Sequence, residues 1–110
     1  MKASRKVSPR AVRDLDDYAS YLANAADILV GLRFLDAAHE AFDLLATQPQ
    51  MGWKVRSRDR DLQLLRFFRV SGFEKMLILY RPRPDGVDIL RVVHGSRNLR
   101  ALLRRREDVE

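Results

Sequence analysis

The sequence predicts a single α+β domain, residues 1–110, in which a helical hairpin packs on a mainly antiparallel sheet. Two patterns indicate this class: apolar residues recur at helical spacing in the first half, and short alternating apolar runs fill much of the second. A third observation concerns residues 88–103, where a β-branched run is followed by Gly95 and then by leucines at helical spacing. A chain of 110 residues is long enough to bury a core of its own.

The first helix is expected to begin at Ser8-Pro9, because a serine hydroxyl can cap the first turn and proline fits the first helical position. Apolar residues then recur at helical spacing up to about Ala25, with charged and polar residues on the other side. The apolar positions are Val12, Leu15, Ala19, Leu22 and Ala26. This pattern predicts an amphipathic helix.

Asp27 is expected to cap a second helix, which must end before Pro49. A helix buried on one side needs only about a third of its circumference to be apolar, and this one has a broader stripe. Its members are Ile28, Leu32, Leu35, Phe42 and Leu45, widened by Phe34, Ala38 and Ala41. The width predicts either contact with both the sheet and the first helix, or surface left for a partner.

Residues 53–61 follow the turn signals Pro49 and Gly52 and are rich in basic side chains. The basic residues are Lys54, Arg56, Arg58 and Arg60. The segment is predicted to be exposed and mobile.

Three antiparallel strands are predicted next, over Leu62–Val70, Lys75–Arg81 and Ile89–Val93, with turns at Ser71-Gly72 and Pro82–Gly86. The middle strand alternates between two faces. Met76, Ile78 and Tyr80 share one face, and Leu77, Leu79 and Arg81 share the other.

A short helix is predicted at the C-terminal end. Gly95 permits a bend after the last strand, and the Ser96 hydroxyl can cap the turn that follows. Leu99, Leu102 and Leu103 then form one apolar face, which is expected to pack back on the sheet. Residues 104–110 are expected to fray.

The net charge of +6 is unevenly distributed. Residues 1–50 sum to −1 and residues 51–110 to +7, so the second half is expected to attract nucleic acid, a nucleic-acid-bound machine or an acidic protein segment. The sequence has no cysteine, which removes disulfides and thiolate chemistry and is compatible with a reducing cytoplasm. It has neither a signal-peptide pattern nor an apolar run long enough to span a membrane.

Few residues offer conventional catalytic chemistry. The only histidines are His39 and His94, and no spacing indicates a metal site, a phosphate-binding glycine loop or a catalytic triad, so no metal or cofactor is expected. His94 is interpreted as a structural residue that closes the last strand, with a general acid or base as the alternative. His39 is interpreted as a packing residue.

The run from Arg91 to Arg97, followed by Leu102-Leu103 and preceded by Leu77–Arg81, resembles the C-terminal half of the ParE toxins of bacterial toxin–antitoxin modules. These toxins belong to the wider ParE/RelE superfamily. The likeness extends back through Pro9–Leu15 and Pro49–Gly52, so it covers nearly the whole chain. The order and spacing of the pieces carry the likeness, because no single piece is specific.

The resemblance adds a first strand over Lys2–Val7 and completes a ParE/RelE-like order, β-α-α-β-β-β with a short C-terminal helix. It implies the toxin of a type II toxin–antitoxin module, a cytoplasmic protein that blocks DNA gyrase or a gyrase–DNA complex and forms a hetero-oligomer with a ParD-like antitoxin. We expect an amphipathic antitoxin segment to lie on the broad stripe of the second helix, at Leu32, Leu35, Phe42 and Leu45. Target binding is expected at Arg91, His94 and Arg97.

The alternative is a RelE-like toxin that cleaves messenger RNA on the ribosome without a metal. That chemistry needs proton transfer and cationic stabilisation, for which the candidates are His94, Arg66, Arg69, Arg81 and Arg91. Against it, no aromatic residue follows Tyr80. A third class, a stand-alone nucleic-acid-binding module, is disfavoured because no exposed aromatic platform is evident.

Overall fold

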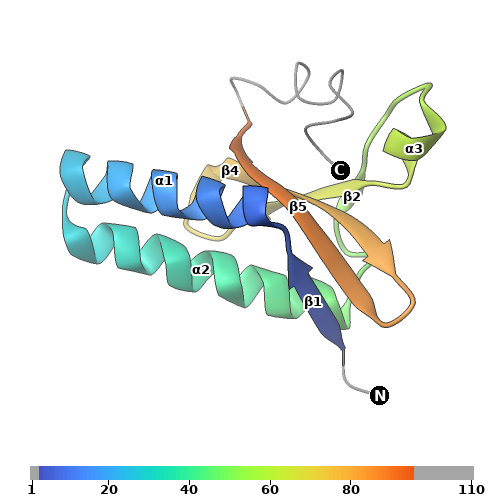
Figure 1. Cartoon of the computed structure of the whole chain (residues 1–110), viewed down its shortest axis with the longest axis horizontal. Coiled ribbons are helices and arrows are strands. Elements are labelled where there is room, and N and C mark those ends of the chain that lie inside the picture. Colours follow the sequence, from blue (N-terminus) through green and yellow to red (C-terminus); the bar gives the residue numbers. More distant parts are fainter. Residues whose placement is uncertain (1–2, 96–110) are drawn as a thin grey trace.

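The structure, a computed structural model, describes residues 3–95, which form two long helices against one face of a five-stranded sheet (Figure 1). The sheet order is β1-β5-β4-β3-β2, antiparallel except where β1 runs parallel to β5. In chain order the elements are β1 (Ser4–Val7), α1 (Pro9–Ala25), α2 (Ile28–Thr47), β2 (Trp53–Lys54), α3 (Arg60–Gln63), β3 (Arg66–Val70), β4 (Phe73–Arg83) and β5 (Gly86–His94). The predicted α+β class, with a helical hairpin on a mainly antiparallel sheet, is confirmed.

Both predicted helix caps are present. The Ser8 hydroxyl accepts a hydrogen bond from the Ala11 backbone N–H at 3.0 Å, and the Asp27 carboxylate accepts one from Leu29 at 2.7 Å. The two helices then pack closely, since a Cβ atom at Gly31 would lie only 2.6 Å from the Ala19 carbonyl oxygen. Small residues therefore permit the hairpin.

The sheet has apolar residues on both faces, as the alternation in β4 predicts. Ile78 and Tyr80 join the core beneath the helices, whereas Leu77 and Leu79 join a second cluster on the opposite face. Phe34 lies at the centre of the helix-side core. Its ring makes edge-on contacts with Tyr18 at 4.9 Å and Phe73 at 5.3 Å between ring centroids.

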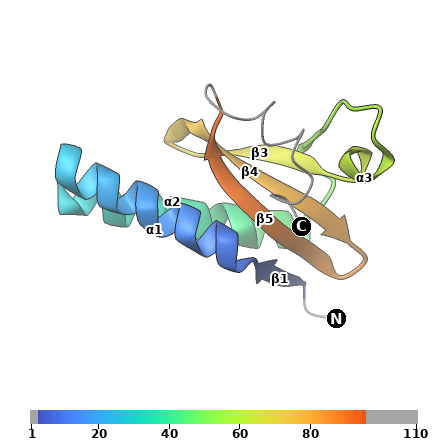
Figure 2. The ribbon, with the colours of Figure 1, turned by 45° about the horizontal axis from the view of Figure 1, so that its top comes forward.

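Some residues of the predicted apolar stripes of the two helices are exposed in the structure. In α1 the buried residues are Ala11 and Leu15, and Val12 is exposed. In α2 the exposed positions include Ile28 and Leu32, near the turn between the helices. The hairpin projects beyond the sheet at this end, so no sheet lies beneath the first turns of α2 (Figure 2). The broad stripe of α2 therefore leaves apolar surface exposed at its N-terminal end.

Residues 53–61 are more ordered than predicted. β2 pairs with β3, and the Asp59 carboxylate caps α3 by accepting a hydrogen bond from Asp61 at 2.9 Å. Val55 and Leu62 are buried in the second cluster, which anchors the segment, while its four basic residues stay exposed. The strand that was predicted to begin at Leu62 begins at Arg66 instead, because α3 occupies the preceding residues.

The predicted C-terminal helix, with Ser96 as its cap and Leu99, Leu102 and Leu103 as its apolar face, lies outside the described residues, as does Arg97. Within residues 3–95, no helix has the length and apolar character needed to cross a membrane.

Candidate interaction surfaces

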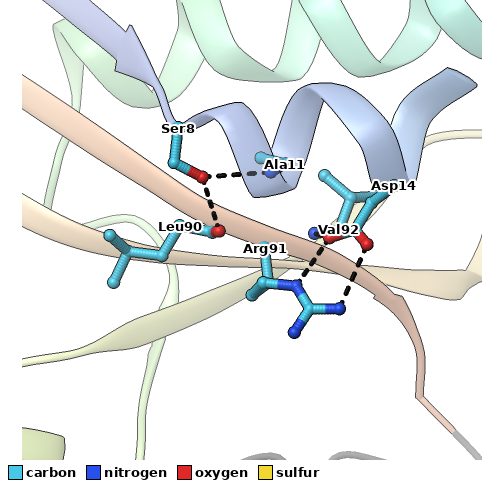
Figure 3. Close-up of polar contacts among 6 residues, drawn as sticks. All are labelled: Ser8, Ala11, Asp14, Leu90, Arg91 and Val92. Atoms are coloured by element: carbon cyan, nitrogen blue, oxygen red, sulfur yellow. Dashed lines mark hydrogen bonds and ion pairs between the residues drawn. The ribbon is translucent and has the colours of Figure 1, made fainter. Parts of the chain in front are cut away.

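The end of β5 is joined to α1 by polar side chains that replace a neighbouring strand. β1 pairs with β5 only from Gly86 to Ile89, so among the described residues the backbone beyond has no strand partner on that side. The Ser8 hydroxyl donates to the Leu90 carbonyl at 2.8 Å, and the Asp14 carboxylate accepts from the Val92 N–H at 2.9 Å (Figure 3). The N-cap residue Ser8 and Asp14 of α1 thereby satisfy this part of the sheet edge.

Arg91 also binds Asp14. Its Nε donates to one carboxylate oxygen at 2.8 Å and its Nη2 to the other at 3.1 Å, in the two-pronged geometry that strengthens such pairs (Figure 3). A β-bulge lies beside this residue, because the register between β4 and β5 shifts between Leu79 and Tyr80. Only 11% of the Arg91 side chain and 15% of the Asp14 side chain are exposed.

This geometry gives Arg91 a role within the fold, and its expected contact with a target stays a prediction. A guanidinium held by a largely buried carboxylate has a structural role, and its release would leave that carboxylate without its cation. Sequence reasoning missed Asp14 because the residue belongs to the polar side of α1. Nothing in the local pattern reveals a partner 77 positions away.

His94 is half-buried at the end of β5. It lines a shallow pocket of about 280 Å³ between this strand and α1, together with Asp14, Asp17, Tyr18, Tyr21, Met76, Arg91, Val92 and Val93. The ring of the exposed His39 contacts Phe42 edge-on, with the ring centroids 5.5 Å apart. Its Nδ1 atom lies 3.0 Å from Nη1 of Arg5, and both contacts agree with a packing role.

The residues of a possible nuclease site are spread across the sheet. Arg81 forms an ion pair with Asp88 at 3.2 Å near the β4–β5 turn, and Arg91 is held at α1. Arg66 binds the carbonyl oxygen of Gly52 at 2.7 Å, on the β2 side of the sheet. Of these three arginines, only Arg91 lines the pocket of His94, and its guanidinium is held by Asp14. Among the described residues, no three His, Asp or Glu side chains form a group able to hold a metal ion.

The projecting end of the helical hairpin carries several exposed apolar side chains. Its members have exposed fractions between 51% and 67%: Tyr21, Ile28, Leu29 and Leu32. We call this set the hairpin patch. Leu35, also predicted to bind an antitoxin, is half-buried beside it. Phe42 and Leu45 are fully buried in the core, so the prediction that they bind an antitoxin is wrong.

A second surface, strongly basic, lies at the β2 edge of the sheet. Residues 53–75 contain seven Lys or Arg and three Asp or Glu, a net charge of +4. Trp53 of β2 is 52% exposed within this region. The positive charge of this region is evident from the sequence, whereas the exposure of the tryptophan ring is not.

A buried tyrosine fixes the loop that leads into β2. The Tyr80 hydroxyl donates to the Pro49 carbonyl at 2.8 Å and accepts from the Gly52 N–H at 2.9 Å. A Cβ atom at position 52 would lie 2.5 Å from the tyrosine oxygen, so only glycine fits there. Burial raises the pKa of Tyr80 above its ordinary value, while the Gly52 N–H and the charge of Arg66 act in the opposite direction.

We expect Tyr80→Phe to reduce the unfolding free energy by about 1–3 kcal/mol at neutral pH, because the buried Gly52 N–H loses its acceptor. Because the pKa of Tyr80 is raised in the folded state, the folded protein holds the phenol proton more tightly than the unfolded chain does. The resulting contribution to the unfolding free energy is fully present below about pH 10 and is lost as the pH rises through the folded-state pKa. Urea unfolding across that range should show this loss in the wild type and not in the variant. Tyr21→Phe, at an exposed position, is the control, and an equal loss there would contradict the assignment.

The fold and its surfaces can be compared with known proteins. A family model described as the ParE toxin of the type II toxin–antitoxin system, parDE, matches residues 5–99, most of the chain. The chain belongs to the ParE toxin family. Membership identifies this ParE-family protein as the toxin component of a type II toxin–antitoxin system. It also confirms the resemblance found in the sequence.

A solved structure titled "Chromosomal ParDE TA system from P. aeruginosa" is similar to this ParE-family chain. The match has a TM-score of 0.67 at 18% sequence identity and covers 83% of this chain and 94% of the other. At that identity the likeness establishes the fold. No curated protein matches the sequence.

Proposed function

We propose that this ParE-family toxin inhibits DNA gyrase and is neutralised by a ParD-like antitoxin. The observation that carries the proposal is the family match over residues 5–99. The dispersed positions of Arg66, Arg81 and Arg91 argue against the alternative, since a metal-free nuclease needs its cations and its proton-transfer group within reach of one phosphate.

The hairpin patch supports an antitoxin partner. Four large apolar side chains gathered on a projecting end are a feature of protein interaction sites, and an amphipathic helix or strand can bury them. We therefore place the antitoxin contact at Leu32 and the neighbouring Leu35, and extend it to Ile28 and Leu29 in place of the buried Phe42 and Leu45. The partner would be expected to form a hetero-oligomer with the toxin.

The test separates inhibition of gyrase from cleavage of RNA. The purified chain should inhibit DNA supercoiling by gyrase or trap cleaved DNA, and it should leave messenger RNA on ribosomes intact. His94→Ala should retain this activity when circular dichroism shows that the variant folds, because inhibition by binding moves no proton. Ribosome-dependent RNA cleavage that is lost in folded His94→Ala would contradict the proposal and favour a RelE-like nuclease.

A second experiment measures whether the antitoxin restores DNA supercoiling by gyrase. Antitoxin added before the toxin should restore gyrase activity, and a heat-denatured antitoxin preparation is the control. Failure of a folded antitoxin to restore activity would contradict neutralisation by direct binding.

A further inference from the structure

Trp53 forms a flat, exposed aromatic surface at the sheet edge. It is the only tryptophan of the chain, and 52% of its surface is exposed. The ring is nevertheless held in place, with its centroid 5.5 Å from that of Phe67 and 6.3 Å from that of Phe68, tilted by about 30° to each. A large aromatic ring that is held in place and half-exposed can stack on another planar group.

Arg69 connects this ring to a neighbouring pocket. Its guanidinium carbon lies 5.8 Å from the Trp53 centroid, and its side chain also lines a shallow pocket of about 270 Å³. The other lining residues are Glu74, Lys75, Leu77 and Gly95. Trp53 is opposite Phe67 and Arg69 is opposite Leu77 in register, so the ring and the pocket share the sheet face turned away from α1 and α2.

The surrounding cations are available to an anion. Within residues 3–95, no carboxylate lies within ion-pair distance of Lys54, Arg56, Arg58 or Arg69. All four side chains are exposed. The carboxylate of Asp59 is used to cap α3. The region therefore presents positive charge beside an aromatic ring.

We propose that this surface binds single-stranded nucleic acid, with an unpaired base stacked on Trp53 and adjacent phosphates held by Arg69 and Lys75. Sequence-tolerant binding of single strands combines these two features, a cationic path for the backbone and an aromatic ring for the bases. A duplex would contact the same cations but would keep its base faces stacked. The inference goes beyond gyrase inhibition, because it gives the toxin a direct nucleic-acid contact of its own.

The single tryptophan makes the test direct. Titrating the full chain with a short oligo-dT strand at low salt should quench its tryptophan emission, and the fitted affinity should fall as salt rises. Trp53→Ala should weaken binding of a fluorescently labelled oligo-dT by about tenfold, whereas Trp53→Phe should retain most of the affinity. Tyr21→Ala, which removes an equally exposed ring on the hairpin patch, should change nothing.

The contribution of the positively charged side chains to binding is tested separately. Arg69→Gln should weaken binding and reduce the slope of log affinity against log salt by about 0.7, the value for one phosphate contact on a single strand. Arg33→Gln, at an exposed position on α2, is the matched control and should leave the slope unchanged. These variants retain Trp53, so the result does not depend on whether Trp53→Ala folds.

Three results would overturn the proposal: no quenching by oligo-dT, equal binding of the corresponding duplex, or full competition by a poly-glutamate peptide at the same charge concentration. The last would identify a docking site for an acidic protein segment. Because gyrase is absent from these titrations, their outcome is independent of the supercoiling assay, and either proposal can fail alone.

Discussion

Arg91→Ala is expected to lower the unfolding free energy by about 3–5 kcal/mol, since removing one partner of a buried ion pair leaves the other charge uncompensated. The charge left behind is the Asp14 carboxylate, whose side chain is only 15% exposed. Its remaining described hydrogen bond comes from the Val92 N–H at 2.9 Å. For a domain with a total stability of about 5–15 kcal/mol, this is a large fraction.

Urea unfolding followed by circular dichroism measures the effect, and Arg81→Ala supplies the matched control. Arg81 also pairs with a carboxylate, but its side chain is 44% exposed and Asp88 keeps a second partner in Arg83. Its loss should cost less than about 1 kcal/mol. Equal losses in the two variants would show that the pair between Arg91 and Asp14 is solvated and that the end of β5 does not depend on it.

The same contact changes how toxicity data at Arg91 should be interpreted. A charge reversal there would place two carboxylates together beside α1, so loss of toxicity would follow from loss of the fold. Target contact at this end of β5 is better examined at His94, which is half-buried and lines the pocket between β5 and α1. The expected role of His94 in target binding stays a prediction.

Features encoded by neighbouring residues were predictable from the sequence. The caps Ser8 and Asp27 and the two faces of β4 each depend on interactions within a few positions, and the structure confirms them. The local signals also located the helical hairpin and its turn. This was enough for the fold class.

Features created by distant residues were not predictable in the same way. The contact between Asp14 and Arg91 joins residues 77 positions apart, and it forms only when the end of β5 lies beside α1. Trp53 was read as part of an irregular segment, and its exposure follows from its place on a short edge strand. The residues around a strand do not indicate whether that strand lies at the edge or in the middle of the sheet.

The helical stripe of α2 illustrates this limit. Leu32 and Phe42 belong to one apolar pattern, yet Leu32 is 51% exposed and Phe42 is fully buried. Periodicity identifies the side of a helix that can be buried, but the extent of the neighbouring sheet decides which residues are covered. Most of the surplus predicted for this helix therefore lies at its N-terminal turns, where the hairpin projects (Figure 2), and Leu44 near its C-terminal end is 40% exposed.

This division within α2 gives the second large effect. Phe34→Ala should lower the unfolding free energy by about 3–5 kcal/mol, because it removes a fully buried ring and leaves a cavity between α1, α2 and β4. Leu32→Asp, two positions earlier, should change stability by no more than about 0.5 kcal/mol, since its side chain faces solvent.

The antitoxin should reverse this order of severity. A partner that binds only the folded toxin adds roughly RT ln(1 + [L]/Kd), about 4 kcal/mol at a thousandfold excess over Kd, so Phe34→Ala should regain a cooperative thermal transition in the complex. Leu32→Asp should fold alone but gain little, because a charge in the hairpin patch would be desolvated when an apolar segment covers it. Thermal unfolding of both variants with and without antitoxin measures the contrast. Equal stabilisation of the two by the antitoxin would place its binding site away from the hairpin patch.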